Sequence, residues 1–263
     1  MSMPTFDPGD DPGPDFVKLL DRTGRSIVRE LPGQFDAGHA TTVLALRTID
    51  GVVLAGDRRA TSGHLISHRT IEKVFEADRF SGVAIAGAAG PAIEMVKIFQ
   101  VQLEHYEKVE GKELSLDGKA NQLSGMIRSN LPAAMQGLAV VPVFAGYDRR
   151  RELGRLYQFD ITGGRYEERD YASTGSGSLH ASTVLKLGFS DAMDTGAAID
   201  LALSALWHAA DEDSATGGPD PIRGIYPVVA NITEDGFARI DDADLAVRVT
   251  ALTANLSTQY GGV

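Results

Sequence analysis

Three polar residues in the first half of the chain could support chemistry together. Thr41 begins the periodic, apolar part of the sequence, and Asp57 and Lys73 follow it at equal spacing. A threonine hydroxyl is a poor nucleophile at neutral pH and needs an adjacent base. If the mature chain began at Thr41, its own α-amine, with an ordinary pKa of about 7.7–8.0, would be partly neutral and could accept a proton. Taken singly, each residue also fits a structural role in a strand, a turn or the surface.

The composition changes near residue 40. Residues 1–16 are dense in proline, glycine and aspartate, a composition that cannot form a packed core. A mixed segment follows to His39, and the regular apolar pattern begins at Thr41. Composition alone is compatible with a flexible tail and with a removable propeptide.

The overall composition excludes several classes of function. The 263 residues carry 36 acidic and 25 basic side chains, a net charge of −11, which argues against a general nucleic-acid-binding protein. The absence of cysteine excludes disulfides, thiolate metal sites and cysteine nucleophiles. The histidines lack metal-ligand spacing, and no phosphate-binding loop or dinucleotide fingerprint occurs. No apolar stretch is long enough to span a membrane, and the N-terminus lacks the apolar region of a secretion signal. We therefore expect a soluble cytoplasmic protein without metal, cofactor, nucleic-acid or membrane partner.

The residues around Asp57 predict a β-hairpin. Two β-branched runs flank Asp50 and Gly51, which is a strong signal for a two-residue turn. Such a turn would pair Ile49 with Val52, and Asp57 would then lie about 10 Å from the level of Thr41. Strict alternation would also place the Asp57 and Thr41 side chains on opposite faces unless a bulge intervenes.

The remaining patterns predict a mixture of strands and helices in separate runs. The helix over 194–211 carries a nearly complete apolar belt, which predicts burial between layers or between subunits. The order favours an antiparallel α+β fold, and nothing indicates a second domain after residue 41. The other expected elements are strands over 81–87, 138–148, 155–164 and 165–174, helices from Pro91 and over 115–137, 178–189 and 242–256, and a hairpin of 226–232 with 237–240.

Several blocks in order resemble the proteasome β subunits, most closely the actinobacterial type. The blocks are TTVLAL, GVVLAGDRRAT, EKVF, VAIAGAAG, LEHYEKVEG, AAMQGL, GSGS and DSATGGPDPIRGIYP, between Thr41 and about Ile240. The resemblance implies a four-layer αββα sandwich of the N-terminal-nucleophile hydrolase class. It also implies a zymogen: residues 1–40 would be a propeptide, removed by autocatalytic cleavage between Ala40 and Thr41, and residues 41–263 the catalytic domain.

The resemblance also implies the site residues. Thr41 would be the nucleophile, Lys73 would sit beside its hydroxyl, Asp57 would hold Lys73, and Gly87 would offer a backbone N–H as oxyanion hole. The free amine would be surrounded by Ser176, Asp213 and Thr216. An apolar pocket, favouring large apolar residues on the acyl side of the cut, would be lined by Ala60, Thr61, Ile71, Phe75, Ile85, Ala89 and Ile93. Thr216 replaces the serine often found there, and Ala40 replaces the usual glycine, which predicts slower processing.

The partners implied are proteasome α subunits, sibling β subunits in stacked heptameric rings, an ATPase unfoldase and unfolded protein substrates. Two alternatives share the fold: a two-ring bacterial threonine protease and a non-catalytic, structural β-type subunit. The HYEKVEG and DSATGGPD blocks favour the proteasome. The presence of Thr41, Asp57 and Lys73 together favours an active threonine-type endopeptidase.

Overall fold

A computed structural model describes residues 41–260. The predicted propeptide, residues 1–40, lies outside the described residues, and so does the Ala40 side of the predicted cleavage site. None of the helices in the described part of the chain is long and apolar enough to cross a membrane.

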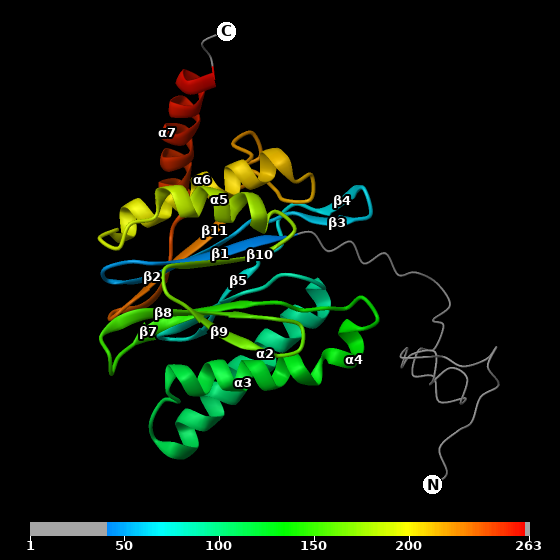
Figure 1. Ribbon diagram of the computed structural model, residues 1–263, viewed down its shortest axis with the longest axis vertical. Helices are drawn as coiled ribbons and strands as arrows, with labels where there is room; N and C mark the ends of the chain where they lie inside the picture. The colour runs from blue at the N-terminus through cyan, green and yellow to red at the C-terminus, as the bar shows by residue number, and fades with distance from the viewer. Residues whose placement is uncertain (1–40, 261–263) are drawn as a thin grey trace, which may run out of the picture. The chain divides into compact units, whose positions relative to one another are not determined.

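Two five-stranded antiparallel sheets pack face to face (Figure 1). The first has the order β10-β1-β2-β11-β12, and its strands are β1 (Thr42–Arg47), β2 (Gly51–Gly56), β10 (Tyr171–Gly175), β11 (Val228–Thr233) and β12 (Gly236–Arg239). The second runs β5 (Val74–Asp78), β6 (Ser81–Ala84), β7 (Val143–Asp148), β8 (Leu153–Phe159) and β9 (Arg165–Glu168). A small hairpin of β3 (Ala60–Ser62) and β4 (Leu65–His68) completes the strands.

Helices cover the outer face of each sheet (Figure 1). The first sheet is covered by α5 (Ser178–Gly188) and α6 (Thr195–Glu212), with α7 (Asp242–Tyr260) packed beside α6. The second is covered by α2 (Ala89–Glu110) and α3 (Leu116–Ser129), followed by the short α4 (Leu131–Ala134). This layering confirms the predicted α+β sandwich of the αββα type, and the apolar belt of α6 is buried as expected.

Side chains of β1 point alternately into two cores, and this fixes the strand that follows Thr41. Leu44 and Leu46 point into the core beneath α5 and α6, whereas Val43 and Ala45 point into the core between the sheets. All four side chains are fully buried. The strand that begins next to Thr41 is therefore held on both faces.

The predicted register of the first hairpin is wrong. Arg47 pairs with Val52, and the Thr48 N–H donates to the Gly51 carbonyl at 2.9 Å, so the turn is centred on Ile49-Asp50 and not on Asp50-Gly51. The pairing is shifted by two residues as a result. Asp57 lies directly opposite Thr42, and its N–H donates to the Thr42 carbonyl at 3.1 Å.

Two other predicted elements are also corrected, and three short strands are added. The expected strand over 165–174 is two strands, β9 and β10, which belong to different sheets and are separated by Arg169-Asp170. The expected helix over 115–137 stops at Ser129, because Pro132 has no N–H to continue the ladder and crowds the preceding turn. The short strands β3, β4 and β5 were not predicted.

Candidate active site

Thr41 lies just before β1, at one end of the first sheet, and only 5% of its surface is exposed. Its carbonyl accepts a hydrogen bond from the Ser176 N–H at 2.8 Å, which ties it to the end of β10. It lines a small pocket together with Lys73 and Gly87. Most of the predicted substrate pocket lines the same cavity, namely Ala60, Thr61, Ile71, Ile85 and Ala89.

Two predicted substrate-binding residues are not among those that line this pocket. Phe75 and Ile93 are half-buried and pack against the core between the second sheet and its helices. Ile85 belongs to the same core and also lines the pocket. Phe75 and Ile93 can therefore influence the pocket through Ile85.

Lys73 is a buried cation at the start of β5. Its side chain is 4% exposed, and its Nζ donates to Asp57 Oδ1 at 2.6 Å and to the Arg59 carbonyl at 2.6 Å. Burial lowers the pKa of the Lys73 ammonium, and the neighbouring Asp57 carboxylate only partly opposes that effect. Lys73 therefore gives up a proton more readily than a solvated lysine.

Asp57 accepts four hydrogen bonds in a fully buried position. Its Oδ1 accepts from the Thr42 N–H at 2.9 Å and from Lys73, and its Oδ2 accepts from the N–H groups of Arg59 at 2.9 Å and Gly217 at 2.8 Å. One carboxylate thus joins β1, the end of β2, the start of β5 and the loop after α6. A buried charge satisfied in this way holds its neighbours firmly.

Gly87 occupies a backbone conformation that requires glycine. Its φ is +104°, and a Cβ there would come within 2.1 Å of the Ala139 carbonyl oxygen. Its bridge to Val140 is made by other groups, the Ala88 N–H and the Ala86 carbonyl. The Gly87 N–H is therefore not used in the bridge, and Gly87 faces the pocket that Thr41 lines.

The structure also brings Ser176, Asp213 and Thr216 together. Asp213 Oδ2 accepts from the Ser176 hydroxyl at 2.5 Å and from the Thr216 hydroxyl at 2.6 Å, and Oδ1 accepts from the Ala215 N–H at 3.1 Å. Burial opposes ionisation of Asp213, but these hydrogen bonds outweigh it and lower the pKa of the carboxyl. The cluster adjoins Thr41 because the Ser176 N–H donates to the Thr41 carbonyl.

Comparison with known proteins agrees with the αββα fold and with the residues gathered around Thr41. A model of proteasome subunits matches residues 37–222. The chain belongs to the proteasome subunit family.

Several of its relatives within that family are β subunits from actinobacteria. A protein named proteasome subunit beta from Acidimicrobium ferrooxidans is 60% identical over 93% of this chain and 91% of its own length. Proteins of the same name from Streptomyces griseus and Frankia alni are 55% and 52% identical, over 84% and 88% of this chain and 79% and 85% of their own lengths. These matches confirm the resemblance to actinobacterial proteasome β subunits. Membership of the proteasome family implies assembly with other proteasome subunits.

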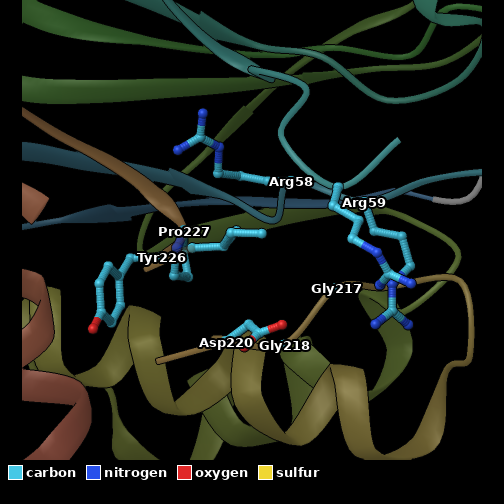
Figure 2. Close-up of a pocket in the computed structure, with 9 residues that line it drawn as sticks. Arg58, Arg59, Gly217, Gly218, Asp220, Tyr226 and Pro227 are labelled. Carbon is cyan, nitrogen blue, oxygen red and sulfur yellow. The ribbon is translucent and has the colours of Figure 1, made fainter. Parts of the chain in front are cut away.

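Arg59 contributes to this candidate site mainly through its backbone. Its N–H bonds Asp57, its carbonyl accepts from Lys73, and its guanidinium donates to the Ser214 carbonyl at 2.8 Å. Arg59 and Gly217 also line an adjacent pocket (Figure 2). Arg59 thereby connects the Asp57–Lys73 pair to the loop after α6.

Two residues of the site were missed by reasoning from the sequence. Thr42 is fully buried, and its hydroxyl contacts Thr216 Oγ1 at 2.5 Å and accepts from the Gly177 N–H at 3.1 Å. Gly217 donates its N–H to Asp57. The available signals were the position of Thr42 next to Thr41 and the location of Gly217 in the DSATGGPD block, but neither indicates a partner distant in sequence.

Proposed function

We propose that this chain is a catalytic β subunit of the proteasome core particle, a threonine-type endopeptidase that hydrolyses unfolded proteins. Thr41 would be the nucleophile, exposed by cleavage after Ala40, with residues 1–40 as propeptide and 41–263 as catalytic domain. One observation carries the proposal: Thr41 lines a single pocket with Gly87 and with the buried Lys73, which is paired to Asp57. Burying a cation costs desolvation free energy. A buried titratable group in a pocket is therefore typical of a functional site.

In the proposed reaction, the Thr41 hydroxyl attacks the carbonyl carbon of a substrate peptide bond. The free α-amine of Thr41 takes the hydroxyl proton, through water, and returns it to the leaving amine. Lys73 stabilises the developing alkoxide and discourages protonation of the amine. The Gly87 N–H stabilises the oxyanion. Water then hydrolyses the ester on Thr41, and Ser176, Asp213 and Thr216 hold the amine throughout.

The precursor would be inactive because its base is missing. In the Ala40–Thr41 amide the nitrogen is not basic, so it cannot accept the proton. Cleavage would be intramolecular: Thr41 Oγ attacks the Ala40 carbonyl, the acyl group shifts from N to O, and water hydrolyses the ester. The step should follow assembly of the rings, so that free subunits cannot digest other proteins.

The chemistry of the pocket supports a preference for apolar residues on the acyl side of the cut. Apart from Lys73, which is paired, its lining carries no charge. An acidic or basic substrate side chain buried there would lose hydration without a partner. Ile85, Ile71 and Ala89 offer it only apolar contact.

The proposed particle contains α subunits and sibling β subunits in stacked heptameric rings, works with an ATPase unfoldase and lies in the cytoplasm. The relatives' names favour it over a two-ring bacterial protease. A purely structural β-type subunit is disfavoured because the Asp57–Lys73 pair is intact at the Thr41 pocket.

The test is co-expression of the full chain with an α subunit, with Thr41→Ala and Thr41→Ser as matched variants. Peptidase activity is measured on a fluorogenic panel, and intact mass reports the first residue of the β chain. We expect wild-type particles to begin at Thr41 and to prefer Leu, Tyr or Phe over Arg or Asp peptides. Thr41→Ala should be inactive and retain Ala40, whereas Thr41→Ser should keep measurable activity. Full hydrolysis by assembled Thr41→Ala particles would refute the assignment.

A further inference from the structure

The hydrogen bond between Thr42 and Thr216 has a direction that the geometry determines. A hydroxyl carries one proton, and the Thr216 proton is used on Asp213, whose lowered pKa keeps it an ionised acceptor. The 2.5 Å contact between Thr42 Oγ1 and Thr216 Oγ1 must then be donated by Thr42. Because Thr42 Oγ1 also accepts from the Gly177 N–H, the bonds form a directed chain from Gly177 through Thr42 and Thr216 to Asp213.

The space around this series of hydrogen bonds leaves no room for a side chain on Gly177. A Cβ on Gly177 would lie 2.5 Å from Thr42 Oγ1 and 2.7 Å from Thr216 Oγ1. Glycine at that position is what allows the backbone N–H to reach the Thr42 hydroxyl. Thr42 itself has no exposed surface.

The backbone of Thr42 is fixed by the opposite half of the site. Its N–H donates to Asp57 Oδ1 at 2.9 Å, and its carbonyl accepts from the Asp57 N–H at 3.1 Å. Asp57 is the partner of Lys73, whereas the hydroxyl chain ends at Asp213. Thr42 therefore connects the two carboxylates, reaching Asp57 through its backbone and Asp213 through its hydroxyl and Thr216.

We propose that Thr42 is a positioning residue, whose hydroxyl holds Thr41 in register with Lys73 on one side and with Asp213 on the other. The inference rests on the proposed function, because it assigns Thr42 a role in Thr41 chemistry. Thr42 does not contact substrate in this role. It acts by keeping the Thr41 hydroxyl and amine in their working geometry, where a displacement of about 1 Å is enough to cost about 100-fold in rate.

The chain offers a matched control at the far end of β1. Thr48 is also buried, and its hydroxyl has no hydrogen-bond partner among residues 41–260. Thr48→Val makes the same chemical change as Thr42→Val without breaking a bond. Thr42→Ser keeps the hydroxyl and removes only a methyl group.

The experiment compares assembled particles of these three variants, wild type and Thr41→Ala. Turnover is normalised to the chains that begin at Thr41 by intact mass. We expect Thr42→Val to lower kcat by about 10- to 100-fold with KM within about twofold, which marks loss of an interaction needed for the chemical step. Thr42→Ser should stay within about threefold of wild type, and Thr48→Val should match wild type.

Two results would overturn the proposal: full kcat per mature chain in Thr42→Val, or a loss in Thr42→Ser as large as in Thr42→Val. If Thr42→Val does not assemble, Thr42→Ser decides, because a tenfold loss there shows that the methyl group matters rather than the hydroxyl. Thr41→Ala separates the two proposals. Activity in Thr41→Ala would refute the proposed function. An inactive Thr41→Ala together with an unaffected Thr42→Val would refute only the role of Thr42.

Discussion

Asp57→Asn should destabilise the fold far more than an ordinary loss of one charge. The carboxylate is fully buried and accepts from the N–H groups of Thr42, Arg59 and Gly217 and from the Lys73 ammonium. An asparagine side chain keeps one oxygen, so its NH₂ group must face two of these donors. Lys73, whose side chain is 4% exposed, loses the negative charge that compensates it.

The magnitude follows from that geometry. Removing one partner of a buried ion pair costs about 3–5 kcal/mol, because the other charge stays buried and uncompensated. Typical domains have a total stability of about 5–15 kcal/mol, so the loss is a large share of it. With a urea slope of about 2–3 kcal/mol per M, the unfolding midpoint should fall by about 1–2.5 M.

The assay is urea unfolding of the full-length chain, followed by circular dichroism, beside Asp191→Asn. Asp191 pairs with Arg47 at 3.1 Å, but its side chain is 64% exposed, so that variant should lose less than about 1 kcal/mol. The double variant Asp57→Asn/Lys73→Met should be less destabilised than the sum of the single changes. A loss below about 1 kcal/mol for Asp57→Asn, or strict additivity in the double variant, would refute the argument.

Three further outcomes are expected. Lys73→Arg should lower peptidase activity by about 100-fold, because a planar guanidinium cannot replace the compact Nζ held by Asp57; activity within a few-fold of wild type would contradict the role of Lys73. Ala40→Gly should speed maturation about two- to fivefold in an intact-mass time course, since glycine reaches a strained turn at about 0.5–1 kcal/mol less, and an unchanged rate would remove this explanation. The Arg155 guanidinium lowers the pKa of Asp117 from 3.8 to about 2, so this pair stabilises the fold above about pH 4 and the gain is lost as pH falls toward 2. Because Asp117 is 45% exposed, Asp117→Asn should cost only about 1 kcal/mol at pH 6 and nothing near pH 2, as urea unfolding at both pH values would show.

The sequence predicted those features that depend on local pattern. The apolar belt of α6, the start of α2 near Pro91 and the order of strand and helix runs were all correct, because helical spacing and turn residues act over a few positions. The antiparallel α+β class followed from that order, and the four-layer sandwich followed from the resemblance. The pocket around Thr41 also collects most of the residues predicted for it.

The register of the first hairpin could not be predicted, for a physical reason. Both faces of β1 and β2 are buried, so Val43 and Leu44 are equally apolar and no alternation marks one face. The Asp50-Gly51 signal then placed the turn one residue later than the turn that forms, which is centred on Ile49-Asp50. The break between β9 and β10 was missed for a related reason, because the change of sheet at Asp170 depends on tertiary packing.

The candidate site is built almost entirely from contacts between distant parts of the chain. Asp57 receives a hydrogen bond from Gly217, and Thr42 reaches Asp213 through Thr216. No segment of the chain can assemble this geometry alone, so the Thr41 environment forms only when the first sheet and the loop after α6 have met. In the proposed precursor the Thr41 nitrogen is also blocked as an amide. Activity would then require two independent events, completion of the fold and release of the amine. A variant that begins at Thr41 but lacks the Asp57 or Thr42 contacts should therefore be mature by mass and still be slow in turnover.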